Sequence, residues 1–180
     1  MNTFLTSDLH FGHANVIRYC NRPFSNVEEM DNGLIENWNA VVTPTDQVFV
    51  LGDMFFCSET RAAQILNRLN GKIALIPGNH DDQIMKSASF SARFWKILPA
   101  LHMERRNGQD VSMSHYPMLS WRNASRGAFM LHGHVHSSVA HDSKIRRYDV
   151  GVDANGFTPV HWDHIVNQLS AIPPVDYRTR

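Results

Sequence analysis

The sequence contains few cysteines, no long apolar run and no excess of charge of either sign. The two cysteines, Cys20 and Cys57, are too few for a disulfide scaffold and do not form a Cys-x-x-Cys pair. No stretch approaches the roughly 18 apolar residues of a membrane-spanning helix, and the first residues lack the charged and apolar regions of a signal peptide. We therefore expect a cytoplasmic protein without a membrane partner.

The charges are balanced, with 17 basic and 17 acidic residues, so no extended surface for nucleic acid is evident. An apolar fraction of 43% excludes a disordered chain. A length of 180 residues suits one domain, which we expect to span residues 1–180 with a poorly ordered tail from about residue 173. The unusual feature is the number of histidines, 11, which favours metal chemistry as the first function to consider.

Short apolar segments alternate with segments of helical periodicity, which is typical of an α/β domain. Strands are predicted at residues 3–7, 46–51, 72–76, 111–114, 129–131 and 148–152. Helices are predicted from a capping box at residues 25–28 to about residue 41, over residues 58–70 and over residues 162–169.

Residues of the kinds that bind metals follow most of these strands. They are Asp8 and His10 after the first strand, Asp53 after the second, Asn79, His80 and Asp81 after the third, His115 after the fourth, and His134 and His136 after the fifth. Sites in open α/β sheets form where loops leave the carboxyl ends of strands. The repetition therefore predicts one site that gathers side chains from five segments.

The individual motifs differ in how specific they are. A pair such as Asp8-x-His10 can aim two side chains at one ion, because alternate strand residues point the same way, but such tripeptides are common. A Gly-Asp pair at residues 52–53 is usually a turn. The sequence Gly133-His134-Val135-His136 is more specific, since it offers two imidazoles next to a glycine that permits close approach. A lone histidine such as His115 is more often structural.

In chain order the motifs read D-x-H, GD, GNHD, H and G-H-x-H, each after a strand. This order resembles the calcineurin-like metallophosphoesterase superfamily from Asp8 to His136, and the sequence is similar to its small stand-alone members. Residues 148–157 also resemble the strand that closes the sheet in small members. The resemblance implies an α/β fold, a four-layer sandwich of two mixed β-sheets flanked by α-helices.

The resemblance also implies two divalent metal ions per chain, with manganese favoured and iron, zinc, nickel or cobalt as alternatives. The implied ligands are Asp8, His10 and His136 for one ion and Asn79, His115 and His134 for the other, with Asp53 bridging both. Two close cations repel each other, so a shared carboxylate and a shared hydroxide are needed between them.

The expected reaction is hydrolysis of a phosphate ester, in which the hydroxide that bridges the two ions attacks phosphorus. His80, like its family counterpart, would protonate the leaving alkoxide, and Asp81 would accept a hydrogen bond from the His80 ring. His13, Arg18 and Arg22 follow the first motif and are candidates for contact with the substrate, although structural roles fit the sequence equally well.

The favoured substrate is a small phosphodiester such as a nucleotide. The residues after Asp53 are Met-Phe-Phe, so the arginine that clamps phosphomonoesters in related protein phosphatases is not evident. A phosphomonoesterase with the same site and a catalytically silent metal-binding scaffold remain alternatives, although silent relatives typically lack the histidine at position 80. Other hydrolase classes are disfavoured, because the sequence has no HxHxDH or GxSxG motif. The oligomeric state stays open.

Overall fold

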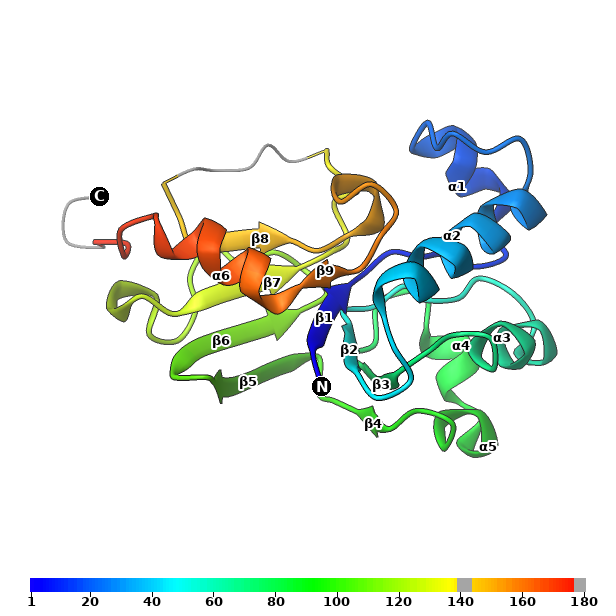
Figure 1. Cartoon of the computed structure of the whole chain (residues 1–180), viewed down its shortest axis with the longest axis horizontal. Helices are drawn as coiled ribbons and strands as arrows, with labels where there is room; N and C mark the ends of the chain where they lie inside the picture. Colours follow the sequence, from blue (N-terminus) through cyan, green and yellow to red (C-terminus); the bar gives the residue numbers. More distant parts are fainter. Residues whose placement is uncertain (139–143, 177–180) are drawn as a thin grey trace.

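The computed structural model of the chain describes residues 1–138 and 144–176. Two β-sheets form its centre (Figure 1). The first sheet has the order β4-β3-β2-β1-β9, with β1 (Thr3–Thr6), β2 (Gln47–Val50), β3 (Lys72–Leu75), β4 (Lys96–Ile97) and β9 (Val160–His161). Strands β1 to β4 run parallel, and β9 pairs antiparallel with β1.

The second sheet has the order β5-β6-β7-β8. Its strands are β5 (Leu101–Arg106), β6 (Gln109–Ser114), β7 (Phe129–His132) and β8 (Arg147–Asp149). Strands β5 and β6 pair antiparallel, whereas β6, β7 and β8 run parallel. Both sheets are therefore mixed, as the family resemblance implied.

Alternation along the strands separates two cores. In β2, Val48 and Val50 face one core, and Phe49 faces the other. The second of these cores lies between the two sheets, because it also contains Val111 of β6 and Leu131 of β7. Strands buried on both faces read as continuous apolar runs, which is why the short strands of the first sheet show no clear polar face.

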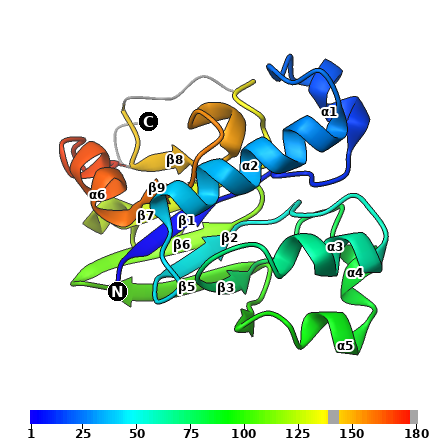
Figure 2. The same ribbon diagram turned by 45° about the vertical axis from the view of Figure 1, so that its right-hand side comes forward.

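The helical segments are α1 (Ala14–Tyr19), α2 (Val27–Val41), α3 (Glu59–Leu66), α4 (Asp82–Met85), α5 (Ala88–Ser91), α6 (Trp162–Ser170) and the 3₁₀ turns η1 (Ala124–Arg126) and η2 (Val152–Ala154). Helices α2 and α3 cover the outer face of the first sheet. Met30, Leu34 and Trp38 recur at helical spacing on α2 and pack on this sheet together with Ile65 of α3. Figure 2 shows α2 running across the sheet.

The outer face of the second sheet has a thinner cover. Met130 points away from the central core and packs with Trp121, Ala124 and Ile145. Helix α6 instead inserts Ile165 into the core between the sheets. The predicted fold class, two mixed sheets flanked by helices, is confirmed.

Some predicted boundaries were wrong. The cap of α2 is Asn26 and not Ser25, because the Asn26 side chain accepts hydrogen bonds from the amides of Glu28 and Glu29 at 3.1 and 2.9 Å. The helix predicted over 58–70 ends at Leu66. The strand predicted over 148–152 occupies Arg147–Asp149, and η2 follows it.

Short elements without a clear pattern were missed, among them α1, β4 and β9. Strand β5 was also missed, because its half-buried positions carry His102, Glu104 and Arg106 and give it little apolar signal. In the predicted loose tail, Val175 is buried against the second sheet, while residues 177–180 lie outside the described residues. Within the described part of the chain, no helix has the length and apolarity that crossing a membrane requires.

Asp46 fastens the beginning of the first sheet, and we expect its contribution to stability to depend on pH. Its carboxylate accepts hydrogen bonds from the amide of Asn2 (2.6 Å) and from the amide and hydroxyl of Thr43 (2.9 and 2.7 Å). These bonds, the one from Asn2 first, lower the pKa of Asp46 from 3.8 to about 2. A carboxyl group with a depressed pKa stabilises the fold above its unfolded pKa, and this contribution is lost as the pH falls through the folded value.

Asp46→Asn should therefore lower the melting temperature at neutral pH, and the deficit should shrink as the pH falls from about 4 to about 2. Thermal melts followed by circular dichroism measure this difference, with the exposed Asp163→Asn variant as the control. A deficit that stays constant over the range would contradict the prediction.

Candidate metal centre

The segments that carry the predicted ligands converge at the carboxyl ends of the parallel strands. Strands β1, β2 and β3 deliver Asp8, His10, Asp53 and Asn79, and strands β6 and β7 of the second sheet deliver His115, His134 and His136. Parallel strands end at the same edge of a sheet, and stacking the two sheets brings their edges together. All seven side chains therefore meet at one place.

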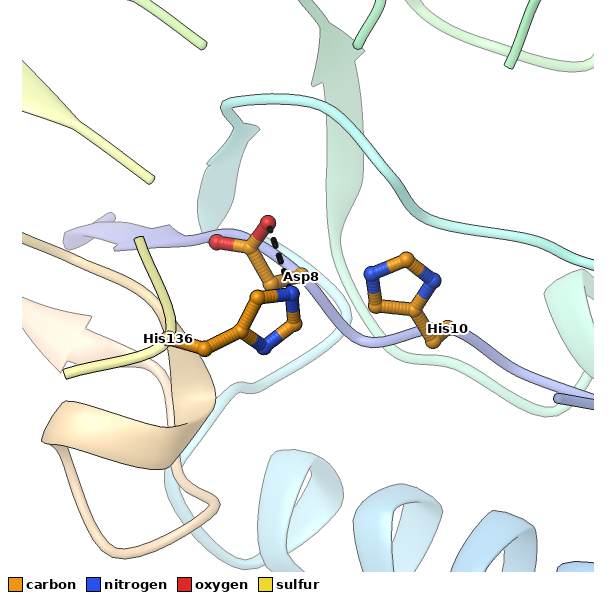
Figure 3. Close-up of side chains that lie close together, drawn as sticks. All are labelled: Asp8, His10 and His136. Carbon is orange, nitrogen blue, oxygen red and sulfur yellow. Dashed lines mark ion pairs between the residues drawn. The ribbon is translucent and has the colours of Figure 1, made fainter. Parts of the chain in front are cut away.

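Two groups of these side chains have the spacing of metal ligands. In the first group, ligand atoms of Asp8, His10 and His136 all lie within 4.8 Å of one another (Figure 3). In the second group, those of Asp53, His115 and His134 satisfy the same limit.

The side chain of Asp53 connects the two groups. Its Oδ2 lies 3.6 Å from Nε2 of His10 and 3.4 Å from Nε2 of His115. The amide oxygen of Asn79 lies 3.1 Å from Nε2 of His115, which adds Asn79 to the second group. The structure thus brings together the side chains of the two ligand sets that the resemblance implied.

The backbone at these positions is strained. Five of the seven residues have φ between 44° and 72°, in the left-handed region: Asp8, His10, Asp53, His134 and His136. Such conformations cost about 1–3 kcal/mol each and concentrate at functional sites. They also correct the sequence argument for Asp8 and His10, because β1 ends at Thr6 and the two side chains converge through a kinked loop, not through strand alternation.

Two glycines let the loops pass directly against the carboxylates. A Cβ atom on Gly133 would collide with the side chains of Ser7 and Asp8, and one on Gly78 would collide with the side chain of Asp53. The close approach predicted for Gly133 is thus an approach to the Asp8 carboxylate. Neither position leaves room for a larger residue unless the metal-site side chains move.

Hydrogen bonds orient two of the imidazoles. Nδ1 of His115 lies 2.8 Å from the carbonyl oxygen of Leu51, and Nδ1 of His136 lies 2.7 Å from Oδ2 of Asp153. Each bond engages Nδ1 and leaves Nε2 facing the site. Metal-binding histidines use this arrangement, because the outer bond fixes the tautomer and the plane of the ring.

A buried carboxylate oxygen at the site fits a bound cation. Oδ1 of Asp8 is buried without a hydrogen-bond partner among the described residues and lies 3.9 Å from Nε2 of His136, whereas Oδ2 of Asp8 accepts a bond from the amide of His134 at 2.9 Å. Buried atoms of this kind are costly unless something binds them. The mixed nitrogen and oxygen donors suit transition-metal ions such as manganese or zinc.

The pKa values of Asp8 and His10 agree with this donor set. Burial raises the pKa of Asp8 to about 6, so its carboxylate lacks a full countercharge that a cation would supply. Burial lowers the pKa of His10 to about 3, which keeps this imidazole neutral and able to bind a metal. Burial alone would raise the pKa of Asp53. A hydrogen bond and the charge interaction with His115, together with the hydrogen bond from the backbone amide of His80, lower it to about 2.

Arg22 corrects one prediction about substrate contacts. Its side chain is fully buried, and its guanidinium binds both carboxylate oxygens of Asp153 at 2.8 Å and the carbonyl oxygens of Asp8 and Leu9 at 2.7 and 3.0 Å. All of these bonds point into the protein, so Arg22 supports the site loops and is not free to bind substrate. Arg18 is exposed, and its guanidinium lies over the ring of Tyr19.

Asp153 is a residue that the sequence analysis missed. It joins Arg22 to His136, and it follows β8 just as the predicted ligands follow their strands, so the same rule would have found it. Cys20, His136 and Asp153 also have metal-ligand spacing. Arg22 already neutralises Asp153, however, and burial raises the pKa of the Cys20 thiol, so this third group suits an ion less well.

Asp81 corrects a second prediction. Its carboxylate does not orient the His80 ring, because its oxygens accept bonds from the amides of Gly78, Asp53 and Met54 at 2.8, 2.8 and 3.0 Å. It therefore ties the loop after β3 to the loop after β2. Burial raises the pKa of Asp81, and the hydrogen bonds from these backbone amides partly offset the increase.

His80 and His13 lie beside the first group. Nε2 of His80 lies 4.0 Å from Oδ2 of Asp53, and its backbone amide donates to Oδ1 of Asp53 at 2.9 Å. The side chain of His80 is 38% exposed, so it can meet a ligand from solvent. The ring centroid of His13 lies 5.3 Å from that of His10 and 4.1 Å from that of Phe56.

Comparisons with known proteins show the family and agree with the fold. The family model of calcineurin-like phosphoesterases matches residues 1–162. An uncharacterized protein of Methanocaldococcus jannaschii is 38% identical over 173 residues, covering 92% of this chain and 90% of that protein. The gene 66 protein of Mycobacterium phage L5 is 31% identical over 186 residues, covering 86% and 88%. A solved structure of a protein of unknown function from Aquifex aeolicus has the same fold, with a TM-score of 0.74 at 23% identity, covering 92% of this chain and 98% of that one.

Removing the outer carboxylate of Asp153 should weaken metal binding. Asp153→Asn keeps the shape of the side chain but loses the charge that holds His136 and pairs with Arg22. Outer partners of this kind typically contribute about 10–100-fold to metal affinity. Titration of the metal-free protein with Mn²⁺ by calorimetry measures the loss, and Asp163→Asn serves as the matched control. Unchanged affinity in Asp153→Asn would show that this carboxylate does not position the ligand.

Proposed function

Because the chain belongs to the calcineurin-like phosphoesterase family, which points to metal-dependent hydrolysis of phosphate esters, we propose that it hydrolyses small phosphodiesters, such as nucleotides, at a centre of two divalent metal ions. The observation that carries this proposal is the convergence of the seven side chains into two groups joined by Asp53. The proposed ligands are those named above, with manganese as the first metal to test. When bound, such ions polarise phosphoryl oxygens and acidify a water molecule that acts as the nucleophile.

His80 is the proposed general acid. Its imidazole is half-exposed and lies beside the Asp53 carboxylate. The hydrogen bond that its backbone amide donates to Asp53 holds its backbone there. The ring stands edge-on to those of His10 and Phe56, with centroids 5.4 and 5.3 Å away. These two rings, and not Asp81, limit its orientation. A positioned imidazole can deliver a proton to the leaving oxygen as the ester bond breaks.

The guanidinium of Arg22 is already occupied within the protein, which supports a diester substrate over a monoester. A phosphomonoester dianion carries more charge, and proteins commonly bind such groups with a bidentate guanidinium. Within residues 1–138 and 144–176, Arg22 is the arginine whose guanidinium bonds to the loops of the site, and Asp153 and two carbonyl groups occupy it. A diester monoanion needs less positive charge and leaves a second ester group to be recognised.

Replacing His80 should affect substrates according to their leaving groups. We expect His80→Ala to lower kcat by about 10²–10³-fold for diesters with alkoxide leaving groups, because these need a proton. For bis(4-nitrophenyl) phosphate, whose leaving group is stable as an anion, the loss should be about tenfold or less. Steady-state kinetics with metal analysis measure both, and the exposed His164→Ala is the control. Equal losses on both substrates would remove the general-acid role.

A substrate screen tests the proposed function itself. The protein is reconstituted with Mn²⁺ and assayed with 4-nitrophenyl phosphate, bis(4-nitrophenyl) phosphate, cyclic nucleotides and short oligonucleotides, while elemental analysis counts the ions. We expect about two ions per chain and a higher kcat/KM for diesters, and Asp53→Asn should lose both metal and activity. A preference for the monoester would favour a phosphomonoesterase. Two bound ions without any turnover would favour a metal-binding scaffold.

A further inference from the structure

An exposed phenylalanine stands at the rim of the site. After β2, Met54 and Phe55 are buried, whereas Phe56 is 46% exposed. Its outward direction is set by backbone pairing, because the amide of Phe56 donates to the carbonyl of Phe11 at 2.8 Å and Phe55 forms a β-bridge with Phe11. The ring of Phe56 is therefore presented to solvent from a fixed segment.

Two imidazoles frame this ring. The ring of His13 stacks on Phe56 with centroids 4.1 Å apart and planes 26° apart, and the ring of His80 stands edge-on at 5.3 Å and 74°. A cavity of about 230 Å³ adjoins Phe56 and His80, and its lining is Phe55, Phe56, Cys57, Ser58, His80 and Ile84. It is smaller than the roughly 300–1,000 Å³ of pockets for drug-sized ligands. Its size and aromatic wall suit a flat ring.

Single exposed apolar residues are common and need no explanation by themselves. Phe56 differs because it shares a cavity with His80, the proposed proton donor, and has His13 stacked against it. If His80 protonates the leaving oxygen, the group attached to that oxygen must lie next to His80. The aromatic wall of the cavity is therefore on the side of the leaving group.

We propose that Phe56, backed by His13, is a stacking platform for a planar aromatic ring in the leaving group of the substrate, such as a nucleobase. This proposal rests on the proposed function and names the class of diester, one whose leaving group is a nucleoside. His13 stacks on Phe56, and the contact with the substrate ring is made by Phe56. Stacking of a base on an aromatic side chain contributes about 5- to 150-fold to affinity when measured by alanine substitution.

The test compares two ligands that differ by the base alone. Calorimetry with the Mn²⁺-loaded protein gives the dissociation constants of adenosine 5′-monophosphate and ribose 5-phosphate. We expect the nucleotide to bind at least about fivefold more tightly in the wild-type protein and in Phe56→Trp, and the preference to disappear in Phe56→Ala and Phe56→Leu. Leucine keeps apolar bulk without a π-face, so it separates stacking from burial. Trp95→Ala, which removes an exposed aromatic residue beside β4, should keep the preference.

The proposal is overturned if the wild-type protein does not prefer the nucleotide, or if Phe56→Ala and Phe56→Leu keep the full preference. Melting temperatures of the variants verify that each one folds. Turnover of bis(4-nitrophenyl) phosphate by the same samples reports separately on the proposed function. If the preference for the nucleotide depends on Phe56 but no turnover is measured, the platform is supported and the hydrolase function is rejected. If turnover is measured but the preference is the same in the Phe56 variants, only the platform is rejected.

Discussion

The contacts of the Asp53 carboxylate are the interaction on which the site depends. One oxygen lies 3.6 Å from His10 and 3.4 Å from His115, and the other accepts the amide of His80 at 2.9 Å. Burying an anion is costly unless charge or hydrogen bonds compensate it. The compensating groups, the amide of His80 and the imidazole of His115, come from the loops after β3 and β6. The same carboxylate therefore ties both sheets together and joins the two candidate ligand groups.

Two further buried acids act behind the site. Asp81 binds three backbone amides and fixes the loops after β2 and β3 to each other. Asp153 binds His136 on one side and Arg22 on the other, and Arg22 in turn holds the carbonyl groups of Asp8 and Leu9. Such supports offset the strained backbone at the ligand positions, because a left-handed residue persists only where its surroundings over-determine it.

The fold could be predicted from the sequence where burial leaves a periodic signal. The central strands read as apolar runs, and α2 shows Met30, Leu34 and Trp38 at helical spacing, so both were predicted close to their true positions. Boundaries failed where neighbouring residues compete for one role, as Ser25 and Asn26 do for the cap of α2. Short or charged elements such as β4 and β5 were missed, because pairing with an existing sheet stabilises them without an apolar pattern of their own.

The sequence by itself determined the family, the fold class and the candidate ligands, since these depend on residue type and order along the chain. Only the tertiary structure decided what the surrounding charges do. From the sequence, Arg22 was a candidate substrate contact and Asp81 the predicted partner of the His80 ring, yet both side chains bind groups inside the protein. The role of Asp153 became clear only from its position beside His136. The physical reason is that a charged side chain takes whichever partner folding brings to it, and here those partners lie up to 131 residues away in the chain.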